Sequence, residues 1–314
     1  MKFGMGLQGR GPVASPENQV LTAQTADDLG FEYALLGDHI IIPGGIDSEY
    51  PYSALGTFTA AEGECLEQLT VLTFVAAQTR RIRLVPSVMI LPHRNILVAA
   101  KVLATIDVLS KGRLTLGVGV GWLREEFEAL GLPSFEERGA VSNEYIRALK
   151  ELWTSDTPTF EGKYCSFSNI IFEPKPVQKP HPPIWIGGES PPALRRAAAL
   201  GDAWHPIGSN HRYPLTTAQE LKASVERLHR YTEAAGRDPA EVEVAYRVQR
   251  YRLTDQGHTH PFVGSADEIA QDIQDFAAAG AQHLIMEFRS DDVNETLARM
   301  EEFASKVMPK VEGL

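Results

Sequence analysis

The chain has 314 residues, of which 43% are hydrophobic and 23% are charged, as is ordinary for a globular protein. Its 30 basic and 41 acidic residues give a net charge of −11, and so acidic a surface repels phosphate backbones, so we expect no nucleic-acid partner. The chain has only two cysteines and no leader-like apolar segment after Met1, so we expect a cytoplasmic protein. No apolar run approaches the roughly 18 residues of a membrane span, so we expect no membrane partner.

Short apolar runs alternate with amphipathic stretches along the whole chain. Eight of the runs are near-continuously apolar, as expected of parallel strands covered on both faces. These predicted strands span residues 2–7, 33–37, 82–90, 113–118, 184–186, 203–205, 242–249 and 283–288. Helices follow them: Ser15 and Pro16 predict the start of the first helix and Gly30 its end, while Ser265 and Glu268 form a capping box for a later one.

Eight strands alternating with eight helical stretches predict an α/β fold, a single (β/α)8 TIM barrel over residues 1–314. A doubly wound open sheet is the competing fold. That fold usually has fewer strands and a G-x-G-x-x-G fingerprint after its first strand, and this chain has no such fingerprint there.

Three connections are longer than the two to six residues usual in α/β units. Residues 39–65 follow the second strand, residues 155–182 precede the fifth, and residues 252–264 follow the seventh. The middle connection carries apolar runs at 160–164 and 170–172 among prolines, which indicates a hairpin-like insertion. Loops that follow barrel strands carry function, so the first and third are candidate substrate walls.

The end of the second strand reads Gly37-Asp38-His39. A carboxylate beside an imidazole at the C-terminal end of a barrel strand is well placed for proton transfer or for hydrogen bonding to a ring. A helix cap or a satisfied buried pair is the alternative interpretation of this dipeptide.

Two further segments follow strands three and four. Pro86 and Pro92 interrupt the first of them, so either a bulge or a simple strand exit is expected there. In the second, alternating glycines over residues 117–121 lead into Trp122 and let another group approach the backbone closely. Trp122 is then either a pocket wall or a core residue.

The fifth strand runs into a Gly187-Gly188 turn and a helix start capped by Ser190. Free N–H groups at a helix start bind phosphate, so this turn is a candidate phosphate site. No metal site is predicted, because the nine histidines form none of the common metal-binding patterns, and there is no P-loop or G-x-S-x-G motif.

Together these segments resemble the luciferase-like monooxygenase superfamily. The resemblance rests on Gly-Asp-His at 37–39, Pro-Ser-Val at 86–88 with Arg-Asn at 94–95, the glycine run to Trp122, and Pro-Ile-Trp-Ile-Gly-Gly at 183–188. Asp38-His39 with the nearby residues 47–52 looks most similar to the branch that depends on coenzyme F420.

The resemblance implies a non-prolyl cis peptide at Ser87–Val88, where the cofactor ring would lie. It implies that Asp38 and His39 line the reacting edge of the ring and that the turn before Ser190 holds the phosphate. The cofactor-binding residues predicted in this way are Asp38, Ser87, Val88, Met89, Gly119, Gly121, Gly187, Gly188, Glu189 and Ser190.

The chain departs from the sugar-phosphate dehydrogenases of the superfamily at two positions. Those enzymes carry a glutamate at the position of Trp122 and sometimes a hydroxyl residue at the position of Ile90. That activity is therefore not expected. His39 becomes the predicted proton donor or acceptor, with Asp38 either orienting it or contacting the cofactor ring, and Glu125 is a weaker candidate. Arg195 and Arg196 are either partners of an acidic cofactor tail or surface cations.

The predicted function is hydride transfer between F420 and a small, partly apolar substrate, with His39 and Asp38 catalytic. Tyr52, His93 and Trp122 are the predicted substrate-pocket residues, and the family leads us to expect a homodimer. Three alternatives stay open: a reduced-FMN monooxygenase, a metal-dependent hydrolase that uses Asp38, His39 and His93, and a non-catalytic cofactor carrier.

Overall fold

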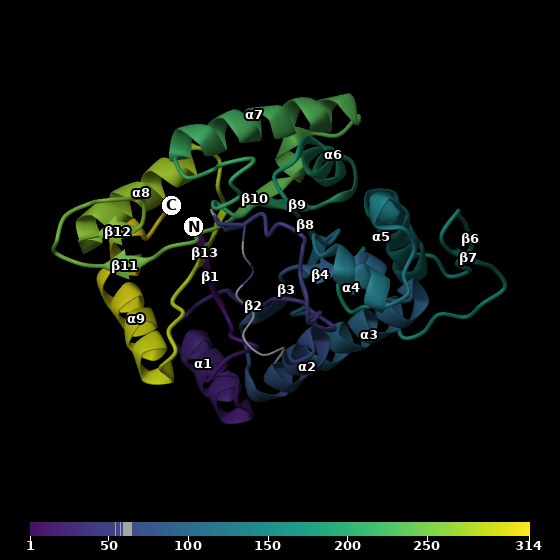
Figure 1. Ribbon diagram of the computed structural model, residues 1–314, viewed down its shortest axis with the longest axis horizontal. Coiled ribbons are helices and arrows are strands. Elements are labelled where there is room, and N and C mark those ends of the chain that lie inside the picture. Colours follow the sequence, from purple (N-terminus) through teal and green to yellow (C-terminus); the bar gives the residue numbers. More distant parts are fainter. Residues whose placement is uncertain (54, 57, 59–64) are drawn as a thin grey trace.

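All eight predicted strand regions form, and they pair in parallel around a barrel (Figure 1). The computed structural model describes residues 1–53, 55–56, 58 and 65–314. The barrel strands are β1 (Lys2–Gly6), β2 (Tyr33–Leu36), β3 (Arg83–Pro86), β4 (Met89–Ile90), β5 (Leu116–Gly119), β8 (Ile184–Gly187), β9 (Ala203–His205), β10 (Glu243–Arg247) and β13 (His283–Met286).

The order of hydrogen-bonded strands is β3-β2-β1-β13-β10-β9-β8-β5-β4. Its two ends belong to one predicted strand, residues 82–90, which breaks into β3 and β4 at Ser87 and Val88. A parallel bridge between Leu84 and Leu114 joins β3 to the segment before β5, and β4 pairs with β5 one step later. The barrel is therefore nearly closed, and the predicted fold class is confirmed.

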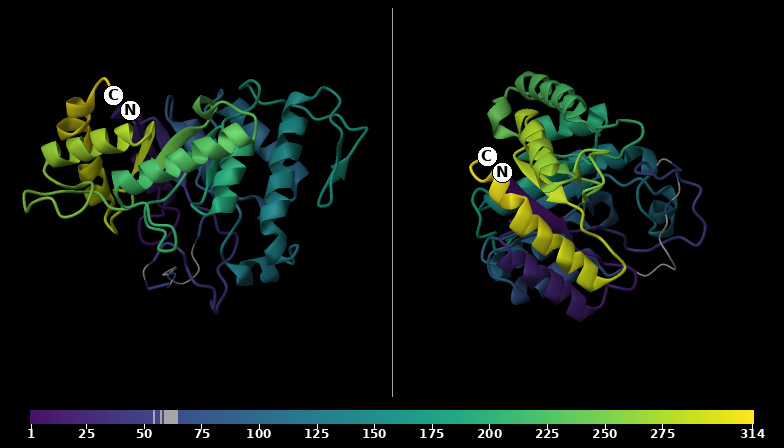
Figure 2. Two further views of the ribbon diagram at one scale, coloured as in Figure 1. Left: turned by 90° about the horizontal axis from the view of Figure 1, so that it is seen from above. Right: turned by 90° about the vertical axis from the view of Figure 1, so that its left-hand side faces the viewer.

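Helices cover the outside of the barrel, and the chain ends lie side by side (Figure 2). The helices are α1 (Pro16–Asp28), α2 (Gln68–Gln78), α3 (Ile96–Leu109), α4 (Arg124–Ala129), α5 (Arg138–Thr154), α6 (Pro191–Leu200), α7 (Ala218–Ala234), α8 (Ala266–Ala278) and α9 (Val293–Lys306). The predicted caps are present: Ser15 accepts a hydrogen bond from Asn18 N–H, and Ser265 and Glu268 form the capping box of α8.

The insertions before the fifth barrel strand and after the seventh lie at the positions that the loop lengths predicted, but the second arm of the hairpin differs from the prediction. The hairpin before the fifth barrel strand pairs β6 (Phe160–Glu161) with β7 (Ser166–Phe167), so residues 170–172 are not its second arm as predicted. Instead Phe172 is buried against the core while Ile171 is exposed. After the seventh barrel strand, β11 (Arg252–Leu253) pairs with β12 (Val263–Gly264). Short 3-10 turns are η1 (Leu91–His93), η2 (Phe135–Glu137), η3 (Pro239–Glu241) and η4 (Met308–Val311).

The barrel interior below the site is filled by side chains from alternate strands, as expected of a packed barrel. Two aromatic rings meet there, Tyr33 and Trp185, with centroids 4.8 Å apart. This interior cluster comprises Tyr33, Leu35, Val85, Trp185, Ala203, Ala245 and Ile285.

Val88 leaves the sheet at the break between β3 and β4 and occupies space that two glycines, Gly119 and Gly187, leave empty. A Cβ on Gly119 would come within 2.4 Å of Val88 Cγ2, and one on Gly187 within 2.8 Å of Val88 Cγ1. A Cβ on Gly117 would meet the Pro86 carbonyl oxygen at 2.2 Å. Two strands on one side of the barrel therefore need glycine because the third strand bulges toward them.

Replacing Gly119 by alanine should destabilise the barrel by about 1–3 kcal/mol, because the added methyl group overpacks the site against Val88. Urea unfolding followed by circular dichroism measures the change in the free energy of unfolding. Gly44→Ala is the matched control, since a Cβ there meets no atom within 4 Å. Equal stability of Gly119→Ala and the wild type would contradict this account of the glycines.

Candidate active site

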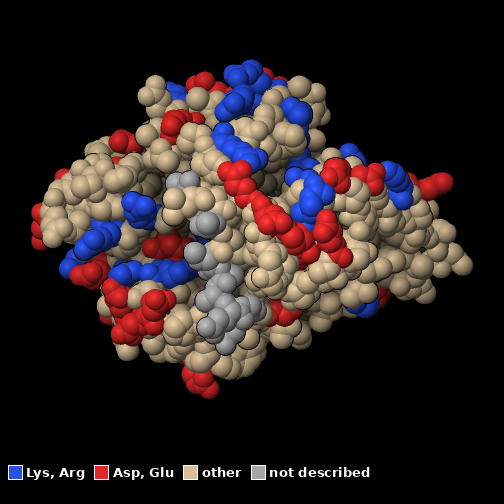
Figure 3. All heavy atoms as spheres, viewed as in Figure 1, with Lys and Arg blue, Asp and Glu red and all other residues tan. Residues whose placement is uncertain are grey.

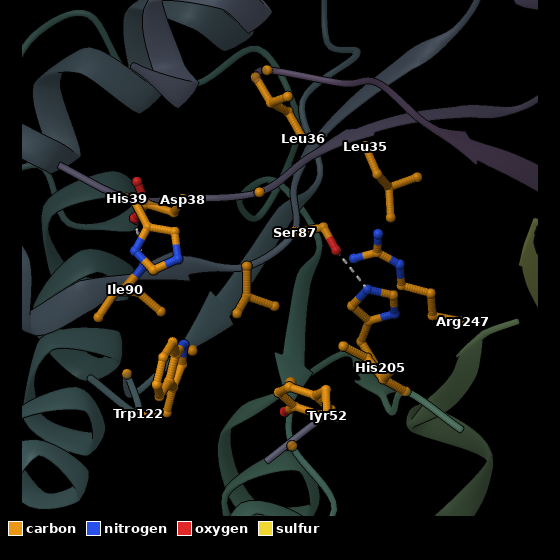
Figure 4. A pocket seen from close by; sticks show the side chains of 18 of the residues that line it. Leu35, Leu36, Asp38, His39, Tyr52, Ser87, Ile90, Trp122, His205 and Arg247 are labelled. Carbon is orange, nitrogen blue, oxygen red and sulfur yellow. Dashed lines mark hydrogen bonds between the residues drawn. The ribbon is translucent and has the colours of Figure 1, made fainter. Parts of the chain in front are cut away.

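A cavity of about 540 Å³ lies at the C-terminal ends of the barrel strands. Its lining comes from segments that follow β1, β2, β5, β8, β9, β10 and β13, together with the break between β3 and β4 (Figure 4). Figure 3 shows the hollow in this face of the molecule. A concave site of this size at this end of a parallel barrel is where ligands of such folds bind.

Ser87 and Val88 form one wall of the cavity, and their peptide bond is cis, as the resemblance implied. The Ser87 hydroxyl lies 2.9 Å from His205 Nε2, and His205 Nδ1 lies 2.6 Å from the Ala245 carbonyl oxygen. Because a carbonyl only accepts, Nδ1 carries the proton and Ser87 donates to Nε2. Burial lowers the pKa of His205 to about 4, so the imidazole is neutral at pH 7.

His39 lines the opposite side of the cavity, and its partner is Glu126 of α4. His39 Nδ1 lies 2.9 Å from Glu126 Oε2, while Glu126 Oε1 accepts the backbone N–H groups of Ile40 and Ile41 at 2.8 and 3.3 Å. Burial alone raises the pKa of Glu126, but interactions that include the hydrogen bonds from His39 and from Ile40 N–H outweigh it, and the pKa lies below its ordinary value. An ionised Glu126 therefore orients the ring.

The prediction that Asp38 orients His39 is wrong, because both oxygens of this buried carboxylate have other partners. Asp38 accepts two hydrogen bonds from the Arg94 guanidinium, at 2.6 and 2.8 Å, and one from Ile90 N–H at 2.9 Å. The pair ties β2 to the end of β4. Such a bidentate pair is strong and positions backbone, so Asp38 holds the bulged strand in place although it borders the cavity.

His93 was predicted to line the substrate pocket, but the structure places it behind the cavity wall. Its side chain is 1% exposed, and its ring packs edge-on against Phe127 with centroids 4.8 Å apart. Neither ring nitrogen has a hydrogen-bond partner among the described residues, and Nδ1 lies 3.8 Å from Glu126 Oε1. Burial lowers the pKa of His93, so a neutral imidazole fills this space.

Aromatic side chains from the 39–65 loop meet Trp122 on one side of the cavity. Trp122 lies 4.9 Å from Tyr50 and 5.2 Å from Phe58, between ring centroids, and Phe58 lies 5.0 Å from His39. Tyr52 is the fourth aromatic residue of this group, which we call the aromatic wall: Tyr50, Tyr52, Phe58 and Trp122. Trp122 and Tyr52 are thus brought together in the pocket, as predicted.

Glu189 lies outside the cavity lining and links the turn after β8 to the loop after β9. It accepts the Ile207 N–H at 2.8 Å and the Asn210 side-chain N–H at 2.6 Å. Burial raises its pKa to about 7. Met89 is likewise fully buried outside the cavity lining, so neither side chain can contact a ligand there as predicted.

The glycine end of the cavity is lined by Gly119, Gly121, Gly187 and Gly188, all of them predicted. Ser190 caps α6 without a side-chain hydrogen bond and lies beyond this lining. Pro191 and Pro192 have no N–H, so the first turn of α6 offers fewer donors than the phosphate prediction assumed.

Two arginines lie behind this glycine end, outside the cavity lining itself. Arg138 donates to the Gly121 carbonyl at 3.1 Å, and Arg196 is buried, bonded to Asn143 at 2.6 Å and Gly139 at 3.0 Å. Burial, and then repulsion by Arg138, lowers the pKa of Arg196 to about 10. Arg196 is therefore not a surface cation, and the guanidinium of Arg195, the other predicted arginine, lies 5.6 Å from the centroid of the Tyr231 ring.

Several cavity residues escaped the sequence-based prediction. His205, Arg247 and Glu287 stand at or just beyond the C-terminal ends of strands six, seven and eight, a position that could have flagged them. Glu126 sits one residue after Glu125, which instead accepts the N–H groups of Asp47 and Ser48 from the 39–65 loop. Only the fold distinguishes these two neighbours.

Two classes of feature are absent from the part of the chain that the structure describes. No group of three or more His, Cys, Asp or Glu side chains there could hold a metal ion. No helix among the described residues combines the length and the apolar character that crossing a membrane requires.

The barrel, its bulged third strand and this cavity define an α/β-barrel protein with a ligand site at the C-terminal ends of its strands. Residues 1–256 match the family model described as luciferase-like monooxygenase, and the chain belongs to that family.

The proteins that the chain resembles include FMN-dependent and F420-dependent enzymes. An FMNH2-dependent dimethylsulfone monooxygenase of Pseudomonas putida is 33% identical over 216 residues, which is 68% of this chain and 53% of that protein, so the chain spans about half the length of this curated relative. A monooxygenase from Streptomyces bottropensis superposes with a TM-score of 0.80 at 24% identity, over 98% of this chain and 99% of that one. A coenzyme F420 dependent tetrahydromethanopterin reductase from Methanopyrus kandleri superposes with a TM-score of 0.76 at 18% sequence identity, over 99% of this chain and 99% of that one.

Glu126→Gln should lower the free energy of unfolding by about 1.5–3 kcal/mol at pH 7, because charge-assisted hydrogen bonds to His39 and two backbone groups are weakened. A carboxylate whose pKa is lowered by folding stabilises the protein above its unfolded pKa and loses that effect as pH falls through the folded value. The difference in the free energy of unfolding between the wild type and Glu126→Gln should therefore shrink below about pH 4.5.

Urea unfolding at pH 7 and pH 4 measures both effects. Glu128→Gln is the control, because it makes the same change on an exposed position of the same helix and should alter stability by no more than about 0.5 kcal/mol. An equal effect of the two variants at pH 7 would contradict the role given to Glu126.

Proposed function

We propose that the protein is an oxidoreductase that binds coenzyme F420 and transfers a hydride between it and a small organic substrate. The observation that carries the proposal is His39, held by ionised Glu126 on the lining of the same cavity as Ser87 and Val88. F420, when bound, supplies hydride chemistry at C5 of its deazaflavin ring. The protein must then supply orientation and a proton.

The residues present fit a flat tricyclic ring. Gly119 and Gly187 flank Val88 without side chains, which leaves a smooth wall along the strand ends. Two buried polar atoms on the lining, Ser209 Oγ and Glu287 Oε1, have no hydrogen-bond partner among the described residues. Buried polar atoms are normally satisfied, so a ligand with polar ring atoms would complete the site.

His39 suits the proton-transfer role. Since Glu126 accepts from Nδ1, that nitrogen carries the proton in the neutral ring, and Nε2 is left to exchange a proton with a substrate. No described residue bonds to Nε2. The aromatic wall beside it limits water and offers an apolar surface to the substrate.

The positive glycine end suits the cofactor phosphate. In the part of the chain that the structure describes, neither Arg138 nor Arg196 forms an ion pair, and each is at least partly buried. Burial, and then the neighbouring Arg124, lowers the pKa of Arg138. Uncompensated cations of this kind are relieved by a bound anion.

A second candidate is a reduced-FMN monooxygenase. It is favoured by the 33% identity to the FMNH2-dependent dimethylsulfone monooxygenase. FMN has the same tricyclic outline and a phosphate, but no acidic tail beyond it. The two cofactors therefore compete for the same wall and the same positive end.

Isothermal titration of the wild type with F420 and with FMN tests the proposal. We expect a micromolar or tighter Kd for F420 and at least tenfold weaker binding of FMN. Arg138→Gln should weaken the binding of F420 by about tenfold but leave the binding of the phosphate-free deazaflavin riboside unchanged, because the positive charge behind the glycine end acts on the phosphate. Arg147→Gln, on an exposed turn of the same helix, is the control.

The opposite preference, tight FMN and weak F420, would replace the proposal with the monooxygenase. Binding of neither cofactor would contradict both. An equal loss for F420 and the riboside in Arg138→Gln would show that this arginine acts on the fold rather than on the phosphate.

A further inference from the structure

One side of the cavity is lined by three arginines and a single carboxylate. Arg10 follows β1, Arg247 ends β10, and Glu287 and Arg289 follow β13. This set, which we call the arginine wall, carries two more positive than negative charges in a protein whose net charge is −11. In Figure 3, basic side chains border the hollow in this face.

Glu287 neutralises only one of the three arginines well. Its Oε2 lies 3.0 Å from Arg247 Nη2, and both side chains are largely buried, at 18% and 19% exposed. Its Oε1 lies 3.7 Å from Arg289 Nε, beyond hydrogen-bond distance. Arg289 is 45% exposed on its side chain and keeps most of its hydrogen-bonding capacity.

Arg10 has no acidic partner among the described residues. Its guanidinium lies over the Phe58 ring at 4.8 Å from the centroid. Burial, followed by repulsion from Arg289, lowers the pKa of Arg10. Arg10 thus joins the arginine wall to the aromatic wall, and one ligand can reach both.

The arginine wall is separate from the positive glycine end. Its residues come from the loops of the first, seventh and eighth barrel strands, whereas Gly121, Arg138 and Gly188 come from those of the fourth and fifth. Figure 4 shows Arg247 and His205 on one side of the cavity, with His39 and Trp122 on the other. A phosphate at the glycine end therefore leaves the arginine wall without an anion.

From this arrangement we infer that the substrate is an organic carboxylate with an apolar or aromatic body. Arg10 and Arg289 bind its carboxylate, and the aromatic wall holds its body beside His39. Planar guanidinium groups match a carboxylate in pairs of hydrogen bonds, and partial burial strengthens them. The inference names the substrate class for the proposed oxidoreductase and rests on that function.

The test uses the purified full chain without cofactor and two probes of the same shape, phenylacetate and its neutral amide, phenylacetamide. Isothermal titration at low ionic strength should give phenylacetate a Kd at least tenfold lower than that of the amide. Arg10→Gln and Arg289→Gln should each cut that preference to about threefold or less. Arg230→Gln, on the exposed face of α7, should keep the preference.

Equal binding of the two probes, no saturable binding of phenylacetate, or an unchanged preference in both variants would overturn the inference. A parallel titration with F420 separates the substrate from the acidic tail of the cofactor. If Arg10→Gln and Arg289→Gln weaken the binding of F420 by about tenfold and leave the binding of phenylacetate unchanged, the arginines bind the cofactor and the inference fails. Failure of the wild type to bind F420 removes the proposed function alone, because the phenylacetate preference is measured without cofactor.

Discussion

The bulge of the third barrel strand at Val88 is the constraint on which the site depends. Val88 projects into space left by Gly119 and Gly187, so the neighbouring strands can approach only without side chains. Asp38 fixes the same bulge from the other side by binding Arg94 and the Ile90 N–H. The result is a smooth apolar wall at the point where polar groups from the other strand ends converge.

Around that wall the protein separates three chemical environments. Ionised Glu126 and His39 provide an oriented acid–base pair, Arg138 and Arg196 provide positive charge at the glycine end, and the arginine wall provides it on the far side. His39 follows the second barrel strand, the glycines of the positive end follow the fourth and fifth, and the arginine wall follows the first, seventh and eighth. A barrel can place unlike groups a few ångströms apart in this way while its packed interior stays apolar.

The fold was predictable because its signals are local. Continuous apolar runs predict buried parallel strands, and caps such as Ser15 and Ser265 predict helix starts. The alternation of these elements then leaves few topologies. The hairpin arm was misplaced because Ile170 to Phe172 is apolar for a different reason: Phe172 packs on the core while Ile171 faces outward.

The site was predictable only in part, because partner choice is a long-range property. Asp38 stands next to His39 in the chain, yet its carboxylate reaches Arg94, and His39 meets Glu126, 87 residues away. The sequence alone does not distinguish the roles of the adjacent Glu125 and Glu126. In the structure Glu125 binds the 39–65 loop at Asp47, whereas Glu126 binds His39. His93 looked available for the same reason, and only packing against Phe127 reveals that it is enclosed.

A crystal structure of the protein soaked with F420 would test the central claim most directly. The account predicts a tricyclic ring that lies against Val88 between Gly119 and Gly187, with its phosphate at Arg138 and one edge facing His39 Nε2. Electron density for the ring elsewhere, or a ring at Val88 whose phosphate lies at Arg10 and Arg289, would contradict it.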